Sequence, residues 1–241
     1  MFPNKFSFNS HSSDLWDIYN GIKSFYPIGI PRGEGVGIFF EYSGLKKLEG
    51  IIMDNVHNEK NFQKRWTDYT DELKKIMKKE IIGTTYGQAP SFSSSIIVEK
   101  NVIGTCTHLK ELHFAKSFVG NFFTIYGLDS TRILDEKGES KGYRAANVVT
   151  ASPFKEFEKD FLLLEKSLRE RYPNHKMVPY AFGQQIINGL QVRYSDAKVC
   201  SIYMALFNDI IQPRNNFQFT QGHFVEHTRG DVYFGLDDWK K

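Results

Sequence analysis

Residues 93–128, SSSIIVEKNVIGTCTHLKELHFAKSFVGNFFTIYGL, contain the pattern that decides the fold. Short runs rich in β-branched and aromatic residues alternate with brief polar or glycine-containing breaks. We predict strands over 93–99, 102–108, 112–118 and 121–128, with a turn at Lys100-Asn101 between the first two. Successive strands with such short connections favour an antiparallel meander, because parallel strands need long crossovers. A further pair, ending near Leu134 and restarting near Tyr143, extends the meander to about residue 150.

The strand at 121–128 has apolar side chains on both of its faces. Since alternate residues of a strand point to opposite sides, Phe122, Tyr126 and Leu128 point one way, and Phe123 and Ile125 point the other. We therefore expect the sheet to be covered on both sides, with two long amphipathic helices, at about 58–82 and 153–172, as its covers.

One long amphipathic helix is predicted over residues 58–82. Its apolar residues recur at spacings of three and four, as on one face of a helix: Phe62, Trp66, Tyr69, Leu73, Ile76 and Met77. Asn58 is a suitable N-cap, and Gly83 is the expected stop.

A second amphipathic helix is predicted over residues 153–172, between a cap at Ser152 and an end at Pro173. Pro153 is expected at its first helical position. Its inward stripe consists of Phe154, Phe157, Phe161, Leu164 and Leu168.

The remaining segments give weaker patterns. Residues 37–42 resemble a strand. In the C-terminal third, Asn188-Gly189 favours a hairpin within 184–194, and a short helix from Pro179 to Gly189 is the competing interpretation. A helix over 196–211 that ends at Pro213, and one or two strands in the tail, complete the prediction. The fold class is thus α+β, with one domain over 1–241 and a possible subdomain at 176–241.

Composition and charge exclude several classes of protein. The chain has 241 residues, 41% of them hydrophobic, which is typical of a folded domain and not of a disordered tail. Its net charge of +3 gives no general reason for nucleic-acid binding. Two cysteines, Cys106 and Cys200, do not form a disulfide framework and favour a reducing compartment. With no secretory signal and no long apolar run, we expect a cytoplasmic protein that does not span a membrane.

A glycine-rich segment could be a phosphate-binding loop; its glycines are Gly29, Gly33, Gly35 and Gly37. Such loops follow a strand and open a helix, whereas these glycines precede the strand expected at 37–42. We therefore expect a turn here, and no cofactor is predicted anywhere in the chain.

One short motif could hold a metal ion. His223-Phe224-Val225-Glu226-His227 resembles the His-x-x-Glu-His motif of inverted zinc peptidases, in which both histidines sit on a helix and bind zinc. The resemblance implies His223 and His227 as ligands and Glu226 as the base. Because Gly222 and Gly230 bracket a segment too short for a stable helix, we favour an extended segment whose imidazoles diverge, about 13 Å apart.

A second candidate for chemistry is Cys106 with His108. Two residues apart on a predicted strand, they share a face and lie about 6.6 Å apart along it, so the imidazole could activate the thiol. An orienting third group and oxyanion donors are not identifiable in the sequence.

A lysine cluster, Lys74, Lys75, Lys78 and Lys79, ends the first predicted helix. It could contact phosphate or an acidic protein, but cations at a helix C-terminus are also typical of a solvated end that complements the dipole. No arginine and no exposed aromatic residue accompanies it, which disfavours nucleic acid.

Taken together, these features favour a non-catalytic, cytoplasmic protein-interaction module that binds a protein partner. In its general character the chain resembles bacterial immunity proteins, which neutralise a toxin by covering it, although no motif is shared. This hypothesis predicts a surface patch of exposed aromatic residues. The alternatives are a hydrolase that uses the His-x-x-Glu-His site or the Cys106–His108 pair, and nucleic-acid binding through the lysine cluster.

Overall fold

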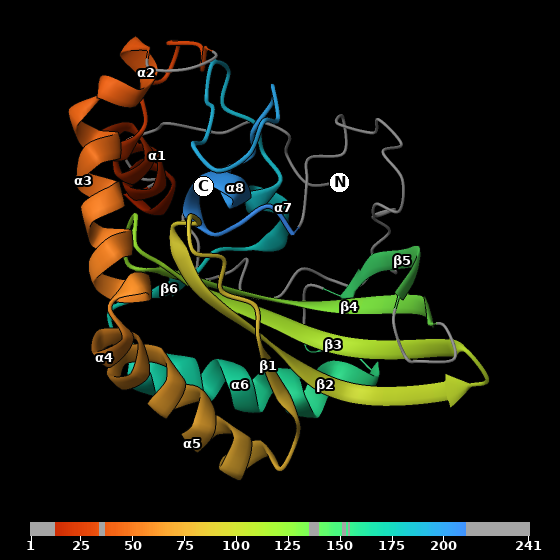
Figure 1. The fold of residues 1–241 in the computed structure, drawn as a ribbon. Coiled ribbons are helices and arrows are strands. Elements are labelled where there is room, and N and C mark those ends of the chain that lie inside the picture. Colours follow the sequence, from red (N-terminus) through yellow and green to blue (C-terminus); the bar gives the residue numbers. More distant parts are fainter. Residues whose placement is uncertain (1–12, 34–36, 135–139, 151–152, 154, 211–241) are drawn as a thin grey trace.

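The computed structural model describes residues 13–33, 37–134, 140–150, 153 and 155–210. An antiparallel meander forms the centre of this structure, and helices pack on both of its faces (Figure 1). The predicted α+β class and the predicted meander are confirmed.

Within the described residues the sheet has six strands, of which the first five follow one another in chain order. Their bounds are β1 Ile81–Gly83, β2 Ser91–Ile103, β3 Cys106–Ser117, β4 Phe122–Leu134 and β5 Ser140–Thr150. All neighbours in this order pair antiparallel. The sixth strand, β6 Lys176–Met177, pairs parallel to the first two residues of β4, and β5 pairs with β4 from Gly127 onwards.

The turn predicted at Lys100-Asn101 is wrong. Both residues lie inside β2, and the chain turns at Gly104-Thr105, where Ile103 pairs with Cys106. A two-residue hairpin loop needs a positive φ, which Gly104 adopts at 58° without steric cost. The strand predicted over 102–108 therefore spans the tip of a hairpin, and fewer, longer strands replace the predicted short ones.

The N-terminal part is helical. Its elements are α1 Ser13–Phe25, α2 Ile38–Glu41, α3 Ser43–Ile52, the π-helical turn η1 Met53–His57, α4 Glu59–Phe62, the π-helical turn η2 Gln63–Thr67 and α5 Asp68–Met77. The strand predicted at 37–42 is therefore wrong, since α2 occupies most of it. Its Phe39 is buried while Ile38 stays exposed, so packing of one aromatic ring overrides the local preference for a strand.

The helix predicted over 58–82 begins as expected but ends earlier. The side chain of Asn58 accepts a hydrogen bond from the Asn61 amide at 3.1 Å. The chain leaves the helix at Lys78, which adopts a left-handed conformation with φ 54°. Gly83 is not the stop, because residues 81–83 form β1 and pair with β2.

The helix predicted over 153–172 is present as a 3₁₀ turn, η3 Lys155–Phe157, followed by α6 Glu158–Arg171. The predicted stripe is buried at Phe157, Phe161, Leu164 and Leu168. Pro153 precedes the helix instead of opening it. Ser152 and Phe154 lie outside the described residues.

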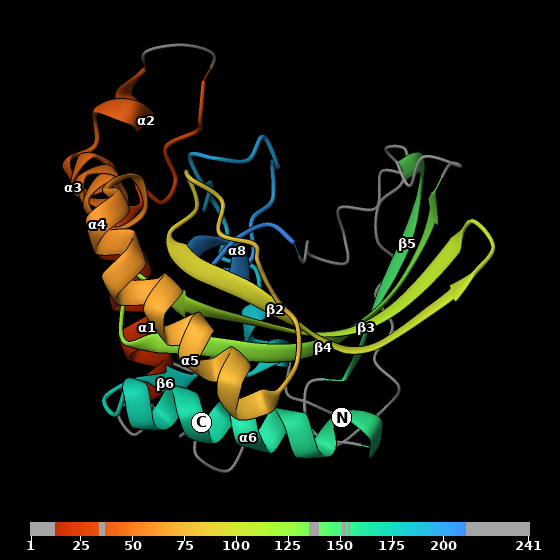
Figure 2. The same cartoon turned by 60° about the horizontal axis from the view of Figure 1, so that its bottom comes forward.

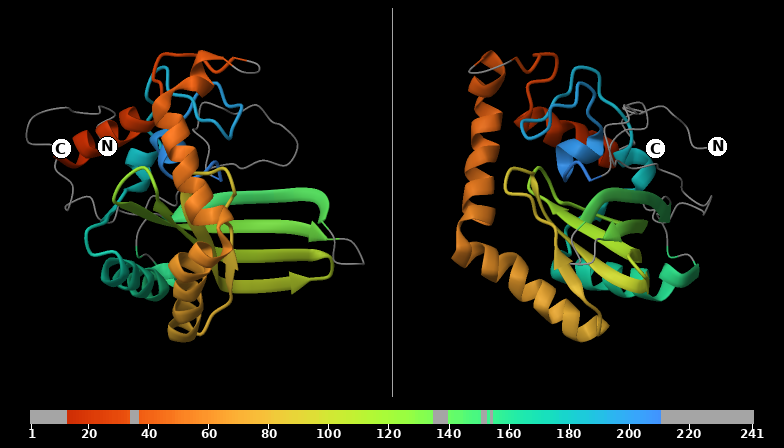
Figure 3. Two further views of the ribbon diagram at one scale, coloured as in Figure 1. Left: turned by 60° about the vertical axis from the view of Figure 1, so that its left-hand side comes forward. Right: turned by 45° about the vertical axis from the view of Figure 1, so that its right-hand side comes forward.

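Both long helices pack against the same face of the sheet, which corrects the expectation that they cover opposite faces. Phe123 and Ile125 lie in one core cluster with residues of α5 and α6. Phe122, Tyr126 and Leu128 lie in a second cluster, as the alternation predicted, but α1, α3 and residues 178–207 complete it. Figure 3 shows α1 and α8 on one side of the green strands and α6 on the other.

Up to residue 210, where the described part of the chain ends, the C-terminal third contains two short helices, α7 Tyr180–Gly183 and α8 Ile202–Leu206. Each competing interpretation of 179–194 is right in part: Pro179 precedes α7, and Asn188-Gly189 forms a turn closed by a hydrogen bond from Leu190 N to Ile187 O. The helix predicted over 196–211 is reduced to α8, because Ser201 is extended and bridges to Ile186. The predicted tail strands lie outside the described residues.

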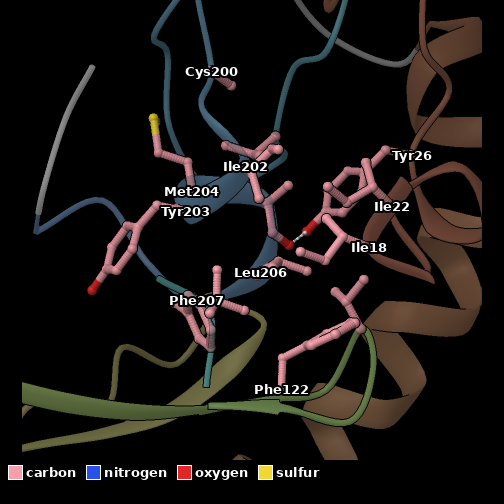
Figure 4. Packing of buried hydrophobic residues seen from close by; sticks show 14 of the residues in the cluster. Ile18, Ile22, Tyr26, Phe122, Cys200, Ile202, Tyr203, Met204, Leu206 and Phe207 are labelled. Carbon is pink, nitrogen blue, oxygen red and sulfur yellow. Dashed lines mark hydrogen bonds between the residues drawn. The ribbon is translucent and has the colours of Figure 1, made fainter. Parts of the chain in front are cut away.

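Helix α8 is completely buried, and side chains satisfy its C-terminal carbonyls. Four consecutive carbonyls, of residues 204 to 207, accept hydrogen bonds of 2.6–2.8 Å from hydroxyls of Tyr194, Tyr26, Ser117 and Ser91 respectively. Figure 4 shows Tyr26 reaching from the end of α1 to the carbonyl of residue 205. Because a buried carbonyl without a partner is costly, these hydroxyls hold α8 in place.

We expect Ser117→Ala to lower the free energy of unfolding by about 1–3 kcal/mol. The Ser117 hydroxyl donates to Leu206 O and accepts from Val119 N, so its removal leaves two buried backbone groups unsatisfied. Urea denaturation measures the change. Ser24→Ala is the control, since the exposed Ser24 bonds only within its own helix among the described residues, and it should change stability by less than about 0.5 kcal/mol. Equal effects of the two variants would contradict the role of Ser117.

Candidate functional site

A pocket of about 240 Å³ opens between the α3–η1 run and two loops. We call it the latched pocket. Its walls come from α3 and η1, from the loop 87–90 between β1 and β2, and from Arg193, with Tyr26 and Tyr194 at its base. Figure 2 shows α3 standing beside the curved sheet.

The helical wall follows from the sequence of α3. Leu45, Leu48 and Ile52 recur at spacings of three and four, and all three are buried. The helix then continues into the π-helical turn η1, which places Met53 and His57 in the lining. π-Helical turns are rare in proteins, and those that occur often lie at functional sites.

Two polar contacts tie the helical wall to the loop wall. The His57 Nε2 lies 2.7 Å from the carbonyl of Gly87, to which it donates a hydrogen bond. An ion pair joins Arg193 Nη1 to Glu49 Oε1 at 2.6 Å. Both ion-pair side chains are nearly half exposed, so the pair adds little stability and its effect is to fix the pocket rim.

The base of the pocket is aromatic. Tyr26 and Tyr194 both use their hydroxyls to bond α8, so their rings are held in a fixed position. Burial raises the pKa of both hydroxyls well above the usual value, which keeps them protonated. The base therefore offers apolar surface and no charge.

The rim combines an exposed apolar residue with polar ones. Met53 is the exposed apolar residue of the rim, at 52%. Tyr86 lies outside the lining but next to it, because its ring contacts that of Tyr194 with centroids 6.2 Å apart, and it is 49% exposed. Arg193, Glu49 and His57 complete the rim. Such a site can seat an apolar group and orient a polar one beside it.

The structure places Cys106 and His108 on β3, where both nitrogens of the imidazole are engaged by β4. His108 Nδ1 lies 3.1 Å from the hydroxyl of Thr131. Its Nε2 lies 3.2 Å from Asp129 Oδ1, a contact that is an ion pair only when the imidazole is protonated. Activation of the Cys106 thiol by His108 would require one of these contacts to break.

The residues proposed for a metal site, His223, Glu226 and His227, lie outside the described residues. Within the described part of the chain, no group of three or more His, Cys, Asp and Glu residues is arranged to hold a metal ion.

The lysine cluster separates in space. Lys74, Lys75 and Lys78 are exposed at the end of α5. Lys79 turns inward, donates to Val98 O at 3.1 Å and lies 3.3 Å from Asp160. Part of the cluster thus stabilises the packing of α5 and is not available to a partner.

A buried polar cluster that we did not predict lies on the sheet face opposite α6. Glu111 accepts hydrogen bonds from Ser95 at 3.3 Å and Ser130 at 3.1 Å. The ring of His113 stacks on Tyr126 with centroids 5.3 Å apart. All of these side chains are buried, so we assign the cluster to the interior of the fold.

No described helix combines the length and apolar character that crossing a membrane requires. A scan of protein-family models, a search of curated proteins and a search of solved structures found no match to this chain. The site is therefore interpreted from its own geometry.

The position of the helical wall depends on a close approach of α3 to α1. A Cβ atom at Gly44 would lie 2.4 Å from the carbonyl oxygen of Ser24, a backbone atom that cannot swing away. We expect Gly44→Ala to destabilise the protein by about 2 kcal/mol or more. Gly50→Ala, in the same helix but with open space around it, should stabilise by up to about 1 kcal/mol. Urea denaturation of both variants distinguishes the opposite signs, and destabilisation by both would contradict the close approach.

Proposed function

We propose that the protein is a non-catalytic binding module that recognises a partner protein through the latched pocket. The partner inserts one apolar or aromatic side chain, and the polar rim contacts the residues around it. A toxin that the module neutralises by covering it is one such partner.

The observation that carries this proposal is the size and chemistry of the pocket. Sites for drug-sized ligands have volumes of about 300–1,000 Å³, and the latched pocket is smaller, at about 240 Å³. A single inserted side chain suits this volume, and anchors of this kind dominate the affinity of many protein interfaces.

The composition of the rim supports the same function. Tyrosine, methionine and arginine are enriched at protein interfaces. The rim offers Met53 and Arg193, and Tyr86 lies next to it against Tyr194. Among the large apolar residues exposed in the described chain, only Trp16 and Tyr86 are aromatic, which is too few for the expected aromatic patch. The pocket therefore takes the place of that patch in the proposal.

Replacement of Met53 by glutamate tests the proposal. The charge at the apolar mouth should weaken partner binding at least tenfold, a loss of about 1.4 kcal/mol. The matched control is Ile76→Glu, because Ile76 is also helical and about as exposed as Met53, at 50% against 52%, but lies outside the pocket. Affinity purification of the full chain from its native cells should recover a stoichiometric protein with the unchanged chain and with the control variant.

Loss of that protein from Met53→Glu alone, followed by direct measurement of the two affinities with the purified partner, would confirm the site. Retention of the partner by Met53→Glu, or repeated recovery of the unchanged chain without a partner, would contradict the proposal. A small molecule found by native mass spectrometry, and lost from Met53→Glu, would show that the pocket binds a metabolite instead of a protein.

A further inference from the structure

Two lysines of β3, Lys110 and Lys116, point to the same face of the sheet but have opposite surroundings. Lys110 Nζ lies 3.1 Å from Glu99 and 3.3 Å from Glu156, and these contacts raise its pKa. Around Lys116 Nζ, no carboxylate of a described residue lies within 4 Å. Among the described residues, carboxylates therefore neutralise Lys110 but not Lys116.

Aromatic rings surround Lys116 instead. Its Nζ lies 5.5 Å from the ring centre of Phe118 and 5.9 Å from that of Tyr172. Contacts of this kind attract the ammonium but leave its charge unneutralised. Burial, together with the positive charge of Arg65, lowers the pKa of Lys116 to about 8. The ammonium is still mostly charged at neutral pH, but its environment disfavours the charge.

The ring of His175, whose nitrogens lack hydrogen-bond partners among the described residues, lies near this lysine. The ring of His175 contacts that of Tyr172 with centroids 5.2 Å apart. Both of its nitrogens are buried from solvent, and neither has a hydrogen-bond partner among the described residues. Burial and the charge of Lys116 lower the pKa of His175 to about 4, so at neutral pH its ring is uncharged and carries one N–H donor. A buried donor without a partner needs an explanation.

The other cations nearby increase the positive potential. The Tyr172 hydroxyl donates to the carbonyl of Arg65 at 3.4 Å, which places η2 next to the group. The Arg65 guanidinium already donates hydrogen bonds to Asp54 and Asn55, each at 2.8 Å. We therefore expect it to contribute positive potential to the site and not a further hydrogen bond. Arg171 also interacts with Tyr172. The charges that act on this group of residues are therefore mainly positive.

We propose that Lys116 and His175 form a binding site for a phosphate group, either free or as a monoester. A phosphate dianion supplies the negative charge that Lys116 lacks and several acceptor oxygens. The ammonium has three N–H donors and the neutral imidazole has one. Tyr172 lies between them and fixes their relative position.

Thermal unfolding of the full chain in inorganic phosphate tests the site, with sodium chloride at matched ionic strength to account for screening. Phosphate at about ten times its Kd should raise Tm by about 3–6 °C. The rise should be larger at pH 7.5 than at pH 9.5, because Lys116 loses its proton between these values. Methyl phosphate in a parallel series distinguishes the two sources, since a site for esters binds it at least as tightly as inorganic phosphate.

The matched variants are Lys116→Met and Lys110→Met, which remove one charge each from the same strand. The phosphate-dependent rise should be lost in Lys116→Met and kept in Lys110→Met. His175→Phe keeps a ring but removes the donor, and it should reduce the phosphate affinity about tenfold. An equal rise in all variants, or no rise above the chloride control in the unchanged chain, would overturn the proposal. If Lys116→Met fails to fold, the phosphate-dependent rise in Tm is compared between His175→Phe and Lys110→Met. A smaller rise in His175→Phe supports the proposal, and an equal rise overturns it.

Discussion

Hydrogen bonds from side-chain hydroxyls to the carbonyls of α8 are the constraint on which the rest of the structure depends. A five-residue helix satisfies few of its own backbone groups, and α8 is buried. Its four donors are Tyr26, Ser91, Ser117 and Tyr194, which belong to segments far apart in the sequence. These bonds join the N-terminal helices, two strands of the sheet and the C-terminal segment. They also orient both tyrosine rings at the base of the latched pocket.

The sequence predicted those parts of the fold that local periodicity determines. The alternation of Phe122 and Phe123 correctly indicated a strand buried on both faces, and the apolar stripes around Trp66 and Phe161 indicated two real helices. The choice of face for each helix depends on contacts between distant residues, and it was not predictable from the stripes. Helices α1 and α3 were missed although their apolar residues also recur at helical spacing, as at Leu15, Ile18 and Ile22 or at Leu45, Leu48 and Ile52. That spacing was the signal that could have found them.

The candidate sites were harder to predict than the fold, because sequence motifs join residues that are close along the chain. Cys106 and His108 form such a pair, yet the imidazole contacts β4 instead. The latched pocket combines residues near positions 26, 50, 90 and 193, and no short pattern connects them. Lys116 and Lys110 point to the same face of one strand. The packing of Glu99 and Glu156 against Lys110, and of aromatic rings against Lys116, distinguishes them.

The bend at Asn58 connects the two proposed sites. Before it, α3 and η1 form a wall of the latched pocket, and after it, α4, η2 and α5 continue toward the sheet, with a visible change of direction (Figure 3). Asp54 fixes this bend, because it accepts hydrogen bonds from Asn61 at 2.7 Å and from Arg65 at 2.8 Å across it. Asp54 directly follows Met53 of the pocket rim, and Arg65 contributes to the positive potential at Lys116. The geometry of the pocket wall and the charge near the phosphate site therefore depend on the same carboxylate.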